Sequence, residues 1–110
     1  AGPTPTPTPA PVPVGPSFTY YRVGPIAESS GCTTSTTDAV YSEHNTIAAA
    51  CAIGEQLFYD SARTNPIANV FAGTDTRYWA IAENNGSNGD YVIGITKASV
   101  DVITSSTSCP

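Results

Sequence analysis

The first sixteen residues constrain the fold of this chain more than any other feature. They read AGPTPTPTPAPVPVGP, in which proline recurs at nearly every second position. Proline removes a backbone donor, fixes φ and pushes the preceding residue toward extended angles. The segment is therefore excluded from helices and inner strands, and we expect a solvated polyproline II arm. At ~3.1 Å per residue, such an arm reaches roughly 45–50 Å.

Arms of this composition are usually linkers, but this one also suits assembly. Because polyproline II is already extended, ordering it on a neighbouring subunit costs less entropy than ordering a flexible tail. Alternating proline lacks half of the N–H groups that strand addition needs, so we expect the arm to occupy a groove. The predicted assembly residues are Pro3, Thr4, Pro5, Thr6, Pro7, Thr8, Pro9, Pro11, Val12, Pro13 and Val14.

The chain divides into the arm, residues 1–16, and one small domain, residues 17–110. The domain is predicted to be mainly β, a small antiparallel β-sandwich or open barrel with at most one short helix. Gly24-Pro25 should bend or end the first strand. Asn45 or Thr46 is expected to cap the helix and Gly54 to end it. We predict strands at 18–23, 39–41, 55–59, 77–82, 91–96 and 99–104, the last three as a meander, and a helix at 47–53.

The charge of the chain excludes some partners. Nine acidic residues face four lysines and arginines, a net charge of -5, whereas phosphate binding needs clustered cations. No apolar run approaches the ~20 residues of a membrane-spanning helix. We therefore expect neither nucleic acid nor a membrane span. Low charge, abundant threonine and the absence of methionine are typical of extracellular or virion-surface β proteins, and we predict that location.

Three cysteines, an odd number, leave one thiol outside any intramolecular disulfide. We favour a Cys51–Cys109 disulfide, because tethering Cys109 near the end would stop the last strand from fraying. Cys32 is the alternative partner. Cys51 stands in the apolar run AAACAI, where a free thiol would pack as a small hydrophobe.

Catalytic chemistry finds little support in the sequence. His44 is the only histidine, and Glu43 and Asp38 near it suggest at most a weak metal or acid–base site. A nucleophile would have to rely on His44 alone as its base. Acid pairs such as Asp60 with Glu55, or Asp90 with Glu83, are interpreted as solvated groups. We expect a non-enzymatic protein without metal or cofactor.

Three neighbouring residues are candidates for surface contacts. Successive side chains of a strand face opposite sides, so either Tyr78 or Trp79 should point outward. An outward Trp79 beside Arg77 would suit a subunit interface or a glycan; the alternative is that Trp79 anchors the core. Asn85 begins an N-glycosylation sequon, and the O-glycosylation candidates are Thr4, Thr6 and Thr8.

Several segments together resemble a known module. They are LFYDSARTNPI at 57–67 with Cys51 before it, RYWAI at 77–81 and the ending VITSSTSC at 102–109. This pattern resembles a small β module of bacteriophage virion and tail-fibre proteins and of some bacterial surface proteins. The resemblance covers roughly the last two-thirds of the chain. This sequence departs from the module's pattern at 97–100 and in the additional Cys32. The resemblance implies a structural or adhesive particle component with no catalytic residues.

These observations predict a non-enzymatic structural subunit, assembled through its N-terminal arm. It would belong to a phage virion, as a fibre or capsid decoration, or to an extracellular filament. Its partners would be copies of itself or other structural proteins of the same particle. The alternative is a carbohydrate-binding or adhesive module on a mucin-like stalk, with glycans as ligands.

Overall fold

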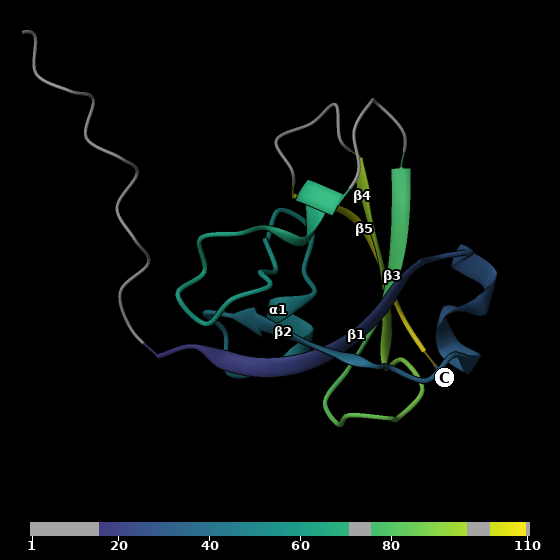
Figure 1. The fold of residues 1–110 in the computed structure, drawn as a ribbon. Helices are drawn as coiled ribbons and strands as arrows, with labels where there is room; N and C mark the ends of the chain where they lie inside the picture. The colour runs from purple at the N-terminus through teal and green to yellow at the C-terminus, as the bar shows by residue number, and fades with distance from the viewer. Residues whose placement is uncertain (1–15, 71–75, 97–101, 110) are drawn as a thin grey trace, which may run out of the picture.

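A computed structural model describes residues 16–70, 76–96 and 102–109, and for residues 69 and 70 it describes only the backbone. Five strands dominate these residues (Figure 1). The elements in chain order are β1 (Phe18–Ile26), the 3-10 helix η1 (Glu28–Thr33), β2 (Asp38–Ser42), α1 (Ile47–Ala50), the 3-10 helix η2 (Ile67–Val70), β3 (Thr76–Ala82), β4 (Tyr91–Thr96) and β5 (Ile103–Ser108).

All five strands form one open antiparallel sheet in the order β2-β1-β3-β4-β5. Strands β3, β4 and β5 follow one another as a meander, with Trp79 opposite Ile93 and Ile93 opposite Ser106. The prediction of a small, mainly antiparallel β domain with a C-terminal meander is confirmed. The described strands form a single open sheet, which is neither a two-layer sandwich nor a closed barrel. Its edge strands are β2 and β5.

Strand β1 bends where the sequence places glycine and proline. Its pairing with β3 shifts register between Val23 and Ile26, across Gly24 and Pro25. Proline cannot donate to the ladder, so the pairing is interrupted there. The predicted bend is confirmed, and the strand continues beyond it to Ile26.

The main core lies between one face of the sheet and the irregular segment 43–70, which crosses that face (Figure 1). Leu57 and Ile67 from this segment are buried against apolar side chains of the strands. Alternation along the strands gives this face its apolar character. The buried strand residues of the cluster are Tyr20, Val40, Trp79, Ile81, Ile93, Ile95 and Ile103.

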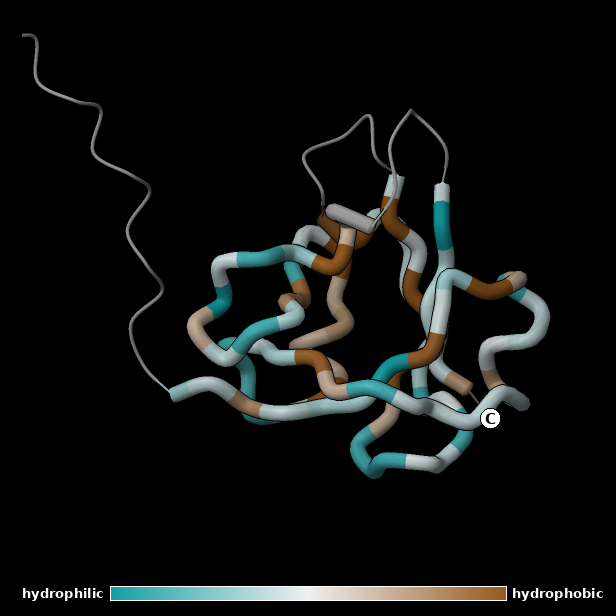
Figure 2. The backbone as a smooth tube through the Cα atoms, in the orientation of Figure 1, coloured by the Kyte–Doolittle hydropathy of each residue, from teal (hydrophilic) through white to brown (hydrophobic). Residues whose placement is uncertain are grey.

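The opposite face is covered in part by η1, which packs on β3 and β4. Gly31 permits this approach: a Cβ built there would lie 2.2 Å from Cγ2 of Val92. In Figure 2 the loop 83–90 that joins β3 to β4 is hydrophilic, in contrast to the hydrophobic stretches of the strands.

A disulfide fixes η1 to the end of the sheet. It joins Cys32 to Cys109 across 77 residues of sequence, and Cys51 is a buried free thiol. The favoured Cys51–Cys109 pairing is therefore wrong, and the alternative partner Cys32 is the one that bonds. Cys51, directly after α1, is buried in the core, whereas η1 brings Cys32 beside Cys109 at the end of β5.

Some predicted boundaries differ from the structure. Residues 55–59 form no strand: Phe58 makes only isolated bridges to Tyr41 and Pro66. Of the last predicted strand, 99–104, residues 99–101 lie outside the described residues, and the described strand β5 begins at Ile103 and continues to Ser108. The helix is a single turn, capped as predicted by Thr46, whose hydroxyl accepts a hydrogen bond from the Ala49 N–H at 3.3 Å.

The arm residues predicted to make assembly contacts, from Pro3 to Val14, lie outside the described residues. Pro16 is the part of the arm that the structure describes. Within the described ranges, no helix has the length and apolar character needed to cross a membrane.

Candidate functional site

A pocket of about 250 Å³ opens on the side of the domain formed by the irregular segment. Two carboxylates and one guanidinium are among the groups that surround it. Its lining residues are Glu43, Gly54, Glu55, Gln56, Phe58, Arg63 and Val102. Charged side chains of both signs in one concave surface make this pocket the candidate site.

The turn after Asp60 positions Arg63 at the pocket. The Asp60 carboxylate accepts hydrogen bonds from the N–H groups of Thr64 and Asn65, each at 3.0 Å, and from the Thr64 hydroxyl. The hydrogen bond from the Thr64 hydroxyl lowers the pKa of Asp60 most, and the hydrogen bonds from backbone N–H groups lower it further. Arg63 lies within this turn at φ 58° and donates its N–H to the Asp60 carbonyl at 3.0 Å.

Arg63 is only 4% exposed, and its guanidinium reaches the root of the arm. Nη1 donates a hydrogen bond of 2.8 Å to the carbonyl oxygen of Pro16. Hydrogen bonds from charged donors are stronger than neutral ones. Pro16 is therefore fixed to a defined point on the domain, beside the pocket.

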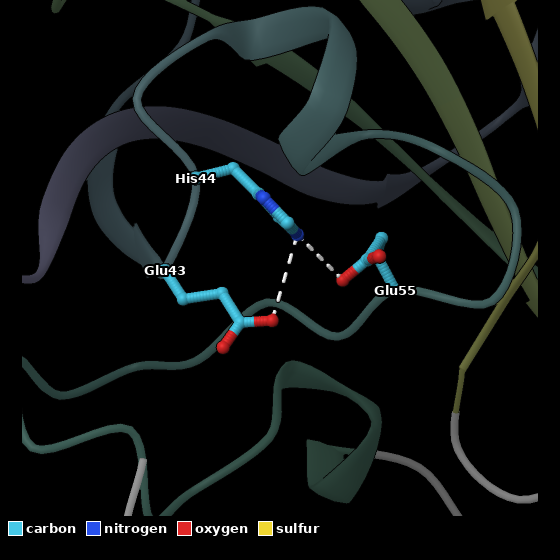
Figure 3. Close-up of side chains that lie close together, drawn as sticks. All are labelled: Glu43, His44 and Glu55. Carbon is cyan, nitrogen blue, oxygen red and sulfur yellow. Dashed lines mark ion pairs between the residues drawn. The ribbon is translucent and has the colours of Figure 1, made fainter. Parts of the chain in front are cut away.

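Glu43, His44 and Glu55 form a compact cluster (Figure 3), and the two glutamates line the same pocket. Nε2 of His44 lies 2.9 Å from Oε2 of Glu55 and 3.5 Å from Oε1 of Glu43. One potential ligand atom from each residue lies within 4.8 Å of the others. The Nε2 atom is buried and makes no hydrogen bond to the part of the chain that the structure describes.

The backbone on both sides of the cluster is held firmly. The N–H of His44 donates to the Ser42 hydroxyl at 3.0 Å, and the His44 carbonyl accepts from the Tyr20 hydroxyl at 2.7 Å. Glu55 is fixed by the start of β5, because its carbonyl accepts from the Ile103 N–H at 2.9 Å. The cluster therefore rests on the sheet through β1, β2 and β5.

This arrangement offers two kinds of chemistry. The three side chains can hold a metal ion, since imidazole nitrogen and carboxylate oxygen are common metal ligands. A histidine paired with a carboxylate can also move a proton. A nucleophile beside the pair would be needed for covalent catalysis, and none of the lining residues supplies a hydroxyl or thiol.

Sequence reasoning paired His44 with Glu43 and Asp38 and missed Glu55. Asp38 lies instead at the start of the edge strand β2, where its Oδ2 atom is 3.9 Å from Nη2 of Arg22. Glu55 reaches the cluster because Gly54 and Glu55 pair with Ile103, a contact between distant parts of the chain. Local spacing contains no signal for that pairing.

The predicted contact residues lie in different environments. Trp79 is fully buried at 0% exposure, so it is a core anchor and is not available as an outward contact. Arg77 and Tyr78 are half-buried on β3. Asn85 of the sequon is exposed, and Thr4, Thr6 and Thr8 lie outside the described residues.

Two other groups from the sequence analysis have structural roles. The Asp90 carboxylate accepts a hydrogen bond from the Glu83 N–H at 3.0 Å and so closes the loop between β3 and β4. Burial raises the pKa of the Cys51 thiol to about 12. A buried, protonated thiol is unreactive, which argues against a nucleophilic role for Cys51.

No family model, characterised protein or solved structure matches this chain. The resemblance to a β module of virion and bacterial surface proteins therefore stays a prediction.

Proposed function

We propose that this protein is a non-enzymatic structural subunit of an extracellular assembly, joined to its neighbours by the N-terminal Pro/Thr arm. The small β domain is the displayed body, and the arm reaches a groove on an adjacent subunit. The assembly is a phage virion, as a fibre or capsid decoration, or an extracellular filament. Its partners are copies of this chain or other structural proteins of the same particle.

The observation that carries the proposal is the hydrogen bond between the buried Arg63 and the Pro16 carbonyl, 2.8 Å long. A linker that only separates two domains does not need a fixed starting point. An arm that must find a groove on a neighbour benefits from one, because each restricted rotation at its root reduces the entropy lost on docking. The stiffness of polyproline II then extends this direction away from the domain.

The disulfide between Cys32 and Cys109 supports the extracellular part of the proposal. Disulfides form and persist in oxidising compartments, and small domains there use them in place of a large core. The same bond ties down the C-terminal end of β5, so that both termini of the described domain are fixed to its body.

The alternative, a carbohydrate-binding module on a mucin-like stalk, needs outward aromatic side chains on a concave surface. Trp79 is buried, and Phe58 is the aromatic residue among the pocket lining. The structural subunit is therefore the better supported proposal. The exposed Asn85 remains compatible with a glycan on either kind of protein.

Removal of residues 1–16 tests the proposal. We expect the full chain to assemble at micromolar concentration and the 17–110 chain to remain a folded monomer, measured by sedimentation velocity. Equal sedimentation of the two as folded monomers would overturn the structural-subunit proposal and favour a stalk.

A further inference from the structure

We propose that Glu43, His44 and Glu55 form a binding site for a late first-row divalent cation, with Zn²⁺ as its representative. The site is independent of the proposed role of the arm in assembly. It uses one nitrogen and two carboxylate oxygens, from the end of β2 and from the segment after α1.

Two of the separations between ligand atoms in the cluster are close to those expected around a tetrahedral ion. Zinc–nitrogen and zinc–oxygen bonds of ~2.0–2.2 Å place neighbouring ligand atoms roughly 3.3–3.5 Å apart. The separation between His44 Nε2 and Glu43 Oε1 is 3.5 Å, and that between His44 Nε2 and Glu55 Oε2 is 2.9 Å. The second contact would open by a few tenths of an ångström, which a half-buried glutamate can accommodate by a small rotation.

The state of His44 favours a ligand at this position. Its Nε2 atom is buried and lies 2.9 Å from Glu55 Oε2 and 3.5 Å from Glu43 Oε1, but neither contact has the geometry of a hydrogen bond (Figure 3). A cation placed between the three side chains would be coordinated by that nitrogen and would neutralise two adjacent negative charges.

The ligand set selects the type of cation. Ca²⁺ takes six to eight oxygen ligands and Mg²⁺ an octahedron of oxygens, whereas one of the three donors of this cluster is an imidazole nitrogen. Imidazole with carboxylates suits zinc and its neighbours in the first row. Three protein ligands leave one coordination position, and since Glu43 and Glu55 also line the pocket, that position is open to water or to a group from a second molecule.

The backbone of His44 and that of Glu55 are each hydrogen-bonded to the sheet. Binding of an ion therefore joins two parts of the chain that are distant in sequence. Ser42 and Tyr20 hold His44, and Ile103 holds Glu55. A bound ion would therefore stabilise the folded domain by mass action, in proportion to its concentration.

Isothermal titration calorimetry of the full chain with ZnCl₂ and with CaCl₂ tests the site. We expect one Zn²⁺ per chain, no measurable Ca²⁺, and a melting temperature that rises with zinc. His44→Gln and Glu55→Gln should each weaken zinc binding about tenfold or more, since loss of a direct ligand exceeds loss of a supporting residue. Glu28→Gln, which removes an exposed carboxylate on η1, is the matched control and should bind as the unmodified chain does.

Glu43→Gln keeps the test valid if the other substitutions impair folding, because the Glu43 side chain is 55% exposed. This variant should fold normally and bind zinc more weakly. The proposal is overturned by the absence of zinc binding at millimolar ZnCl₂, or by unchanged zinc affinity in folded Glu43→Gln and His44→Gln chains. Equal affinity for calcium would also overturn it, since that result describes a nonspecific acidic surface.

Discussion

Arg63, a residue that is 4% exposed, donates a hydrogen bond of 2.8 Å from Nη1 to the carbonyl oxygen of Pro16. Forty-seven residues separate the two in sequence. The bond depends on the turn before it: Asp60 organises this turn, the turn holds Arg63 at φ 58°, and Arg63 holds the root of the arm. The first two predictions test the roles of Arg63 and Asp60.

Replacement of Arg63 should release the root of the arm. Arg63→Ala should lower the free energy of unfolding by about 2 kcal/mol, the usual contribution of a hydrogen bond from a charged group. Arg63→Gly should be about 1 kcal/mol less destabilising, because glycine relieves the strain that the arginine Cβ has at this positive φ. Urea denaturation measures both values. Wild-type midpoints, together with an unchanged exchange rate of the Phe18 amide, would show that Arg63 does not hold the arm.

Asp60 should make the stability of the domain depend on acid pH. The pKa of Asp60 in the folded protein lies below 3.8, the ordinary value of an aspartate. Its carboxylate therefore contributes stability that is fully present above about pH 4. That stability is lost as the pH falls through the lower, folded pKa. Asp60→Asn should therefore be less stable at pH 6 and should show a flatter decline in stability between about pH 5 and pH 2. Glu28→Gln serves as the control for loss of one negative charge, and a parallel decline in all three chains would refute the prediction.

The pairing Cys32–Cys109 predicts a specific thiol count. The native, unreduced protein should not react with a thiol reagent at pH 8, because Cys51 is buried and its pKa is raised to about 12. The unfolded, unreduced protein should expose one reactive thiol. Replacing Cys32 and Cys109 by alanine should cost about 2–5 kcal/mol of stability, as expected for a long closed loop. A peptide map that joins Cys51 to Cys109 would contradict the structure.

Trp79 is the only tryptophan of the chain, and its burial makes it a probe of the core. Its fluorescence should be blue-shifted, poorly quenched by acrylamide and unaffected by sugars. Trp79→Phe should destabilise the domain by about 1–3 kcal/mol through imperfect packing. Efficient quenching in the folded protein would mean that the indole is exposed and would restore it as a candidate contact residue.

Strand patterns near each other in sequence predicted much of the fold. Alternation in RYWAIA and YVIGIT, separated by a loop rich in asparagine and glycine, indicated the β3–β4 hairpin that the structure contains. Thr46 at the start of an alanine run indicated the helix cap. In both cases the relevant contacts lie within a few residues, where propensity and turn chemistry decide the conformation.

Contacts between distant segments could not be predicted in the same way. The run EQLFY at 55–59 has the composition of a strand. In the structure Leu57 is buried in the core, and Phe58 makes only isolated bridges. Cys109 was assigned to Cys51 because no local pattern places η1 beside the end of β5. Glu55 joins His44 through the pairing of 54–55 with Ile103, which sequence spacing does not encode.

We propose that a stiff, proline-rich arm joins subunits of this protein. The most direct measurement is the solution mass, by multi-angle light scattering, of the full chain, of residues 17–110, and of a full-length chain whose arm prolines are replaced by serine. We expect the unmodified full chain to form an assembly and the other two chains to be folded and monomeric. Assembly of the serine variant to the same mass as the full chain, or one monomeric mass for all three, would contradict it.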